Sequence, residues 1–253
     1  MSFSHIKVNI GTARHAPARP PTGKLYVPAR PIFNTGREPV KSAFRNVSIS
    51  SIVALIAIVF FCAAVALAIV SFPPGFTPLE NWMSDLGNPV LNPAGATYFN
   101  GACMITGLLL VIFYPGLRMW RETGAVQAPV MNVALAAGIF SGIALAGVGL
   151  FPETFKPHHF IVSVLFFLSS TLAILLTTVA LRGHVGLSKT SVRAGYLTVA
   201  IGVIFALQMA LLPEVTILEW ISVFSMLLWA AMISRDMLKA RGKQALYQSL
   251  PIS

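Results

Sequence analysis

Charged residues are scarce in this chain. Only 10% of its 253 residues are Asp, Glu, Lys or Arg, against a hydrophobic fraction of 56%. Soluble domains carry about 25% charged residues, so the composition excludes a water-soluble globular protein. Its high apolar content also excludes disorder for the bulk of the chain, because disordered segments are poor in apolar residues.

Cysteine is nearly absent as well. Cys62 and Cys103 are the two cysteines, and each lies inside an apolar segment, without the paired spacing of a disulfide framework or a metal site. Ionisable residues are missing from the middle of every long apolar segment. Carboxylates at that depth mark proton relays and ion pathways, so their absence disfavours a proton-coupled pump.

Six long apolar segments are the dominant feature of the sequence. Each is close to the roughly 20 residues that a membrane-spanning helix needs. They are apolar all round, whereas the strands of a membrane barrel alternate. The sequence therefore predicts an all-α, polytopic membrane protein with a six-helix transmembrane bundle, its helices at residues 51–70, 94–114, 130–150, 159–181, 194–212 and 217–234.

The basic residues predict the orientation of this bundle. Seventeen of the 18 Lys and Arg fall in the terminal segments and the second and fourth links, and Lys156 is the exception. Cytoplasmic loops are enriched in Lys and Arg, so we expect a multi-pass protein of the cell (plasma) membrane with both termini in the cytoplasm. The predicted division is a disordered, basic Pro/Arg-rich tail (1–48), a six-helix domain (49–236) and a basic C-terminal tail (237–253).

The N-terminal tail has two interpretations. Its positive charge can simply keep the N-terminus inside, or it can bind anionic lipid headgroups, at about 1 kcal/mol per basic residue near the surface. Membrane lipids are the partners we expect. The formal charge of +10 comes mainly from the cytoplasmic side, and it requires no nucleic acid as a partner.

The first outer link, about residues 71–93, is predicted to contain a short amphipathic helix. Thr77 fits the N-cap, Pro78 the first helical position, Glu80 the third residue of a capping box and Gly87 the C-cap. The predicted apolar face, spaced as in a helix, is Leu79, Trp82, Met83 and Leu86, and the predicted polar face is Glu80, Asn81, Ser84 and Asp85.

Two of the predicted spanning helices carry ridges of small residues at every fourth position. Such ridges let helix backbones approach closely. We therefore expect the third and fifth spanning helices to be central and closely packed, with each other as one arrangement. The ridges are Ala134, Gly138, Gly142 and Ala146, and Ala194, Thr198, Gly202, Ala206 and Ala210.

Polar residues of the outer face form the candidate site. Capping explains Glu80, and also Glu219, which follows Thr216 by three residues. It does not explain Asp85, Glu153, His158 or His159, and these four, with Ser84, are the candidate catalytic residues. The same four are the candidate ligands of a Zn²⁺ ion, since three protein ligands plus water form a catalytic zinc site. Residues expected to line an outward-facing pocket are Asn81, Asn100, Ser163 and Gln208.

Packing alone can also account for several of these side chains. Buried Asn, Ser and Gln hydrogen-bond between membrane helices, at about 0.6 kcal/mol each on average. Adjacent histidines on a helix point about 100° apart, which hinders ligation of one metal by both.

Several motifs resemble a known family. These are Asn81-Trp-Met-Ser-Asp-Leu-Gly87, then Phe99-Asn100-Gly101, then Gly149-Leu-Phe-Pro-Glu153 followed by His158-His159. Together they resemble the prokaryotic membrane family catalogued as domain of unknown function 998, over about residues 50–236. The resemblance implies a six-helix integral membrane protein and no established activity.

Three functions remain open from the sequence. The first is a membrane protein that binds a lipid or small ligand at its polar outer rim. The second is a membrane-embedded, metal-dependent hydrolase of lipid-like substrates. This chain lacks a second histidine pair at helical i+4 spacing, which disfavours the metal centre. The third is a small-solute transporter, disfavoured by the lack of charge at the midplane. A hydrolase predicts bound metal, a transporter predicts solute flux, and a binding protein predicts neither.

Overall fold

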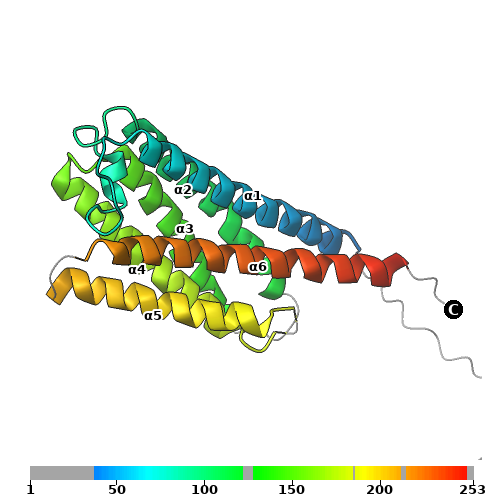
Figure 1. Ribbon diagram of the computed structural model, residues 1–253. Coiled ribbons are helices and arrows are strands. Elements are labelled where there is room, and N and C mark those ends of the chain that lie inside the picture. Colours follow the sequence, from blue (N-terminus) through cyan, green and yellow to red (C-terminus); the bar gives the residue numbers. More distant parts are fainter. Residues whose placement is uncertain (1–36, 122–127, 185, 212–214, 250–253) are drawn as a thin grey trace, which may run out of the picture. The chain divides into compact units, whose positions relative to one another are not determined.

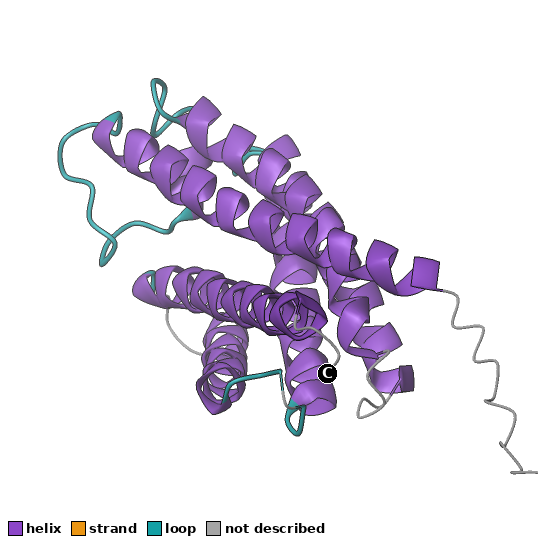
Figure 2. Ribbon diagram, turned by 90° about the vertical axis from the view of Figure 1, so that its right-hand side faces the viewer, coloured by secondary structure: helices purple, strands orange, loops and turns teal. Residues whose placement is uncertain are grey.

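The computed structural model describes residues 37–121, 128–184, 186–211 and 215–249, and all regular structure within them is helical (Figures 1 and 2). Six helices are long and apolar enough to cross a membrane, as predicted. The chain is therefore a multi-pass membrane protein. The helices are α1 (Arg37–Val70), α2 (Ala96–Gly116), α3 (Ala128–Leu150), α4 (Lys156–Leu181), α5 (Lys189–Leu211) and α6 (Ile217–Ser249).

The first and last helices, α1 and α6, extend beyond the spans that the hydropathy predicts. Helix α1 begins at Arg37, inside the segment assigned to the N-terminal tail, and its apolar span begins at Ile49. Pro39 lies in the first helical turn, where a missing N–H leaves no bond unmade. Helix α6 continues past its apolar span to Ser249. Residues 1–36, with the predicted lipid-binding tail, lie outside the described residues.

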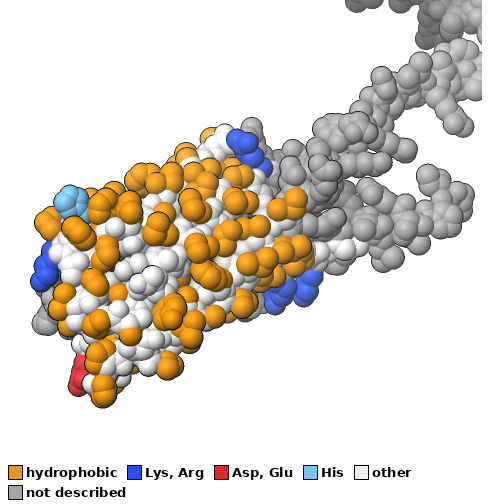
Figure 3. Space-filling model, turned by 90° about the horizontal axis from the view of Figure 1, so that it is seen from above, with side chains coloured by type: hydrophobic (Ala, Val, Ile, Leu, Met, Phe, Trp, Pro, Cys, Tyr) orange, Lys and Arg blue, Asp and Glu red, His pale blue; other side chains and the backbone are white. Residues whose placement is uncertain are grey.

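Consecutive helices contact one another, and α6 returns to contact α1, so the six form a closed ring (Figure 1). Apolar side chains cover the middle of the face seen in Figure 3, and the charged side chains visible there lie near the ends. We call one end, with residues 71–95, 151–155 and 215–216, the acidic end. The other, with residues 117–121, 182–184 and 186–188, is the basic end.

The ridge of α3 packs closely, as predicted, but its partner is α2. A Cβ atom built on Gly142 would lie 2.6 Å from the backbone oxygen of Gly107 in α2. The main helix partners of α3 are α2 and α4, and those of α5 are α4 and α6, so the arrangement in which α3 and α5 pack mainly against each other is not found. Within the ridge of α5, Gly202 faces α4, where a Cβ would lie 2.5 Å from Thr171 Oγ1. Thr198 of the same ridge instead donates a hydrogen bond to the Ser225 carbonyl of α6 at 3.1 Å.

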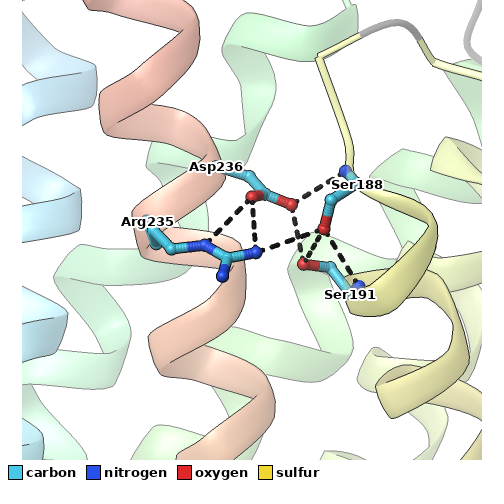
Figure 4. Close-up of polar contacts among 4 residues, drawn as sticks. All are labelled: Ser188, Ser191, Arg235 and Asp236. Atoms are coloured by element: carbon cyan, nitrogen blue, oxygen red, sulfur yellow. Dashed lines mark hydrogen bonds and ion pairs between the residues drawn. The ribbon is translucent and has the colours of Figure 1, made fainter.

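At the basic end, a buried carboxylate joins α6 to the start of α5 (Figure 4). Asp236 is 3% exposed. Its Oδ2 accepts hydrogen bonds from the Ser188 backbone N–H at 2.9 Å and from the Ser191 hydroxyl at 2.6 Å. Arg235 pairs with its other oxygen at 3.1 Å. Ser188 also caps α5, because its Oγ accepts from the Ser191 N–H at 3.1 Å.

Candidate functional site

The first link of the acidic end is attached to the start of α6 by side chains. Thr216 Oγ1 donates a hydrogen bond to the Pro78 carbonyl, and Trp220 Nε1 donates one to the Asn81 carbonyl, each at 3.0 Å. These bonds fix the segment before the short 3₁₀ helix η1 (Ser84–Gly87). The link is therefore a built part of the bundle.

The predicted amphipathic helix is not continuous. One turn forms at Thr77, η1 follows later, and Leu79 is 73% exposed although it was predicted on the apolar face. The predicted capping box is also wrong, since the Thr77 N–H donates to Asn81 Oδ1 at 3.2 Å and not to Glu80. Contacts with α6 and α2, which local spacing does not reveal, determine this conformation.

Glu219 does not complete a capping box either. Its Oε2 accepts from the backbone N–H groups of Met83 at 2.6 Å and Ser84 at 3.3 Å. The partners are about 135 residues away in sequence, so no local pattern indicates them. A carboxylate at the first N–H groups of η1 satisfies donors that the helix itself leaves free.

Asp85, the second residue of η1, is buried and does not lie on an exposed polar face. Its Oδ2 accepts from the Trp82 backbone N–H at 2.9 Å and from Asn81 Nδ2 at 3.3 Å. Burial, and secondarily the negative charge of Glu153, raise the pKa of Asp85 to about 6. The two predicted carboxylates are thus neighbours, as the candidate site requires.

Glu153 connects the first and second links. Its Oε2 accepts a hydrogen bond from Asn88 Nδ2 at 2.9 Å. The predicted pocket residue Asn100 has a related structural role, since its Nδ2 donates to the Gly87 carbonyl at 2.8 Å. Gly87 permits this approach, because a Cβ there would lie 2.7 Å from the Phe99 ring.

The two histidines point in different directions. His158 is exposed and stacks on the Phe151 ring, with centroids 5.4 Å apart. His159 is buried, and its Nδ1 lies 2.8 Å from the Phe151 carbonyl. Within the described parts of the chain, no three His, Cys, Asp or Glu side chains are placed to hold a metal ion. The predicted zinc ligands Asp85, Glu153, His158 and His159 therefore do not form such a group.

A cavity of about 550 Å³, which we call the mouth cavity, opens at the acidic end between α4 and α5. Ser163, a predicted pocket residue, lines it, and so does the candidate Ser84. Asn81, Asn100 and Gln208 do not line it, and Gln208 is buried in α5. The polar side chains of its wall are Ser84, Glu153, Lys156, His159, Ser163 and Glu219.

A second, narrower cavity of about 80 Å³, the interior cavity, lies inside the ring of helices. Its walls are mainly apolar and reach Trp229 in α6. At 1.5 Å per residue, Trp229 lies about 15 Å along that helix from Glu219. Ser84, Ser163, Phe167 and Glu219 line both cavities, so the two meet at these residues.

Sequence reasoning missed Glu219, Lys156 and the aromatic residues Phe167 and Phe205 of the mouth cavity. Glu219 had a satisfactory local explanation as a cap. The two phenylalanines lie in apolar spans, where nothing in the sequence separates an inward-facing from a lipid-facing position.

One of the comparisons with known proteins finds a family for most of this chain. A family model described as "Protein of unknown function (DUF998)" matches residues 55–236, which is most of the chain and all six spans except the start of α1 and the end of α6. Neither the curated proteins nor the solved structures contain a significant match to this sequence.

Proposed function

We propose that this chain, which belongs to the DUF998 family of proteins of unknown function, binds an amphiphilic molecule. The polar head group would lie in the mouth cavity and the hydrocarbon chain would enter the interior cavity. A volume of about 550 Å³ lies within the usual range of small-molecule sites, about 300–1,000 Å³.

The junction of the two cavities is the observation that carries this proposal. Three of the four shared residues, Ser84, Ser163 and Glu219, are polar. The other residues that line the interior cavity are mainly apolar. A site with polar groups at one end and an apolar arm at the other matches the two ends of an amphiphile. The apolar arm also runs in the direction in which a membrane lipid extends its chain.

The mouth cavity also offers access from the membrane. Its α4 and α5 walls include side chains on the lipid-facing surface, with Phe160 58%, Leu168 55% and Met209 46% exposed. A molecule dissolved in the bilayer can therefore enter sideways between α4 and α5, without leaving the apolar phase.

A buried polar side chain supports an occupant in the interior cavity. Thr106 lines this cavity, is 3% exposed, and its hydroxyl finds no hydrogen-bond partner among the described residues. Buried polar groups are nearly always paired, so this lack of a partner favours a ligand with a hydrogen-bonding group there.

The orientation of the site is part of the proposal. The bias of Lys and Arg toward the basic end supports cytoplasmic termini, with the acidic end facing the outside of the cell membrane. The mouth cavity would then take its ligand from the outer leaflet.

Blocking the mouth cavity tests the proposal. Ala206 lines the cavity on α5, whereas its neighbour Leu207 is 51% exposed and lines neither cavity. We expect native mass spectrometry to detect one bound amphiphile on the wild type and on Leu207→Phe. Ala206→Phe should lower its occupancy about tenfold, the factor that corresponds to about 1.4 kcal/mol. Equal occupancy in the two variants, or none in the wild type, would refute binding at this site.

A further inference from the structure

We infer that the amphiphile of the mouth cavity carries a cationic, ammonium-type head group. This inference rests on the proposed function and names the chemical class of its ligand. The charged side chains that line the cavity are two carboxylates and one lysine, and none of them forms an ion pair within the described residues.

Two carboxylates line the mouth cavity, a third lies beside one of them, and the three come from different parts of the chain. Glu153 and Glu219 line it, and Asp85 lies beside Glu153. In the described part of the protein none of the three forms an ion pair, and the ion pair that is present, Arg235–Asp236, lies at the basic end. A bound cation would supply the missing partner of this group.

The hydrogen-bonding groups at the cavity are mainly acceptors. A carboxylate only accepts, and Glu219 uses one oxygen, Oε2, for the backbone of η1. His159 Nδ1 faces the Phe151 carbonyl, which cannot donate, so Nδ1 carries the proton. In the neutral ring, Nε2 is then an acceptor as well. A primary ammonium, which has three donors and no acceptor, complements this set.

Aromatic rings form another part of the same wall. The rings of Phe167 and Phe205 are 4.7 Å apart between centroids, and those of Trp82 and Phe205 are 6.5 Å apart. All three side chains line the mouth cavity. Aromatic faces next to carboxylates bind ammonium groups through cation–π attraction, which strengthens when the cation leaves water.

Thr106 lines the interior cavity, and its buried hydroxyl, without a partner among the described residues, gives independent support for an occupant of the joined cavities. Lys156 is the charged group that opposes a cation, and it is exposed and makes no ion pair with the carboxylates within the described residues. Lys156 acting alone would instead favour an anionic head group. The test therefore includes a cationic and an anionic head group.

The test compares three ligands with one twelve-carbon chain and different head groups: dodecylammonium, dodecanol and dodecanoate. Each is titrated by calorimetry into the full chain in maltoside micelles. We expect dodecylammonium to bind at least about tenfold more tightly than the other two, a factor that one ion pair out of bulk water supplies. Glu153→Gln should remove this preference, with an unchanged circular dichroism spectrum and thermal midpoint as evidence of an intact fold. The matched variant Glu80→Gln, exposed on the first link, should keep it.

The outcomes separate the two proposals. Equal binding of the three ligands, tighter binding of dodecanoate, or a preference that survives Glu153→Gln would each overturn the ammonium inference, while binding of an amphiphile would stand. Binding of none of the three would overturn both.

Discussion

Gly107→Ala should destabilise the bundle severely, whereas Gly101→Ala, the same change six residues earlier in α2, should not. A Cβ on Gly107 would lie 2.6 Å from the backbone nitrogen of Ala146 in α3, and backbone atoms cannot move aside individually. Overpacking of this kind typically costs about 1–3 kcal/mol and sometimes more. A Cβ on Gly101 meets nothing within 4 Å.

The free energy of unfolding, measured by dodecyl sulfate titration in mixed micelles, distinguishes the two changes. We expect Gly107→Ala to lose about 3 kcal/mol. Gly101→Ala should match the wild type or gain up to about 1 kcal/mol from better helix propensity. Gly142→Leu, on the facing ridge, should fail to accumulate as folded protein. Comparable stability of all these variants would show that α2 and α3 are not in backbone contact.

Asp236→Ala should have the second large effect, much larger than that of Arg235→Ala. The change leaves the Ser188 N–H and the Ser191 hydroxyl without their acceptor at the start of α5. Hydrogen bonds to a charged group contribute about 1.5–3 kcal/mol each, so we expect a loss of about 3 kcal/mol. Arg235 is 47% exposed, and an exposed ion pair contributes at most about 1 kcal/mol.

The same unfolding titration compares Asp236→Ala, Asp236→Asn and Arg235→Ala with the wild type. Asp236→Asn, which keeps one acceptor oxygen, should fall between the wild type and Asp236→Ala. Equal losses for Asp236→Ala and Arg235→Ala would mean that the ion pair, and not the cap on α5, is what stabilises this corner.

The six spans could be predicted because their signal is local. A run of about 20 apolar residues identifies a spanning helix whatever it packs against. The structure places the predicted helix at 159–181 within α4 (Lys156–Leu181), and the other spans agree as well. The partner of a small-residue ridge is not a local property, which is why the close packing of α3 could be predicted from the sequence and its partner α2 could not.

The candidate site could be predicted only in part, for the same reason. The sequence predicts which links share one end of the bundle. This was enough to place Asp85 near Glu153 and to place Ser163 in a cavity at that end. It was not enough to predict the contact of Glu219 with Met83 and Ser84, because that contact joins α6 to the first link. His158 and His159, adjacent in sequence, point to different surroundings because successive residues of a helix are rotated by about 100°.

The most direct measurement of the central claim uses Trp229 as a reporter of the interior cavity. This side chain is 1% exposed, so a quencher reaches it through the cavity. We would titrate 12-bromododecanol, whose bromine is at the end of the chain, and record tryptophan fluorescence in the wild type and in Trp229→Phe. Binding of an amphiphile predicts saturable quenching near one ligand per protein, which Trp229→Phe largely removes and Ala206→Phe prevents. Quenching that does not saturate, or that is unchanged in Trp229→Phe, would contradict it.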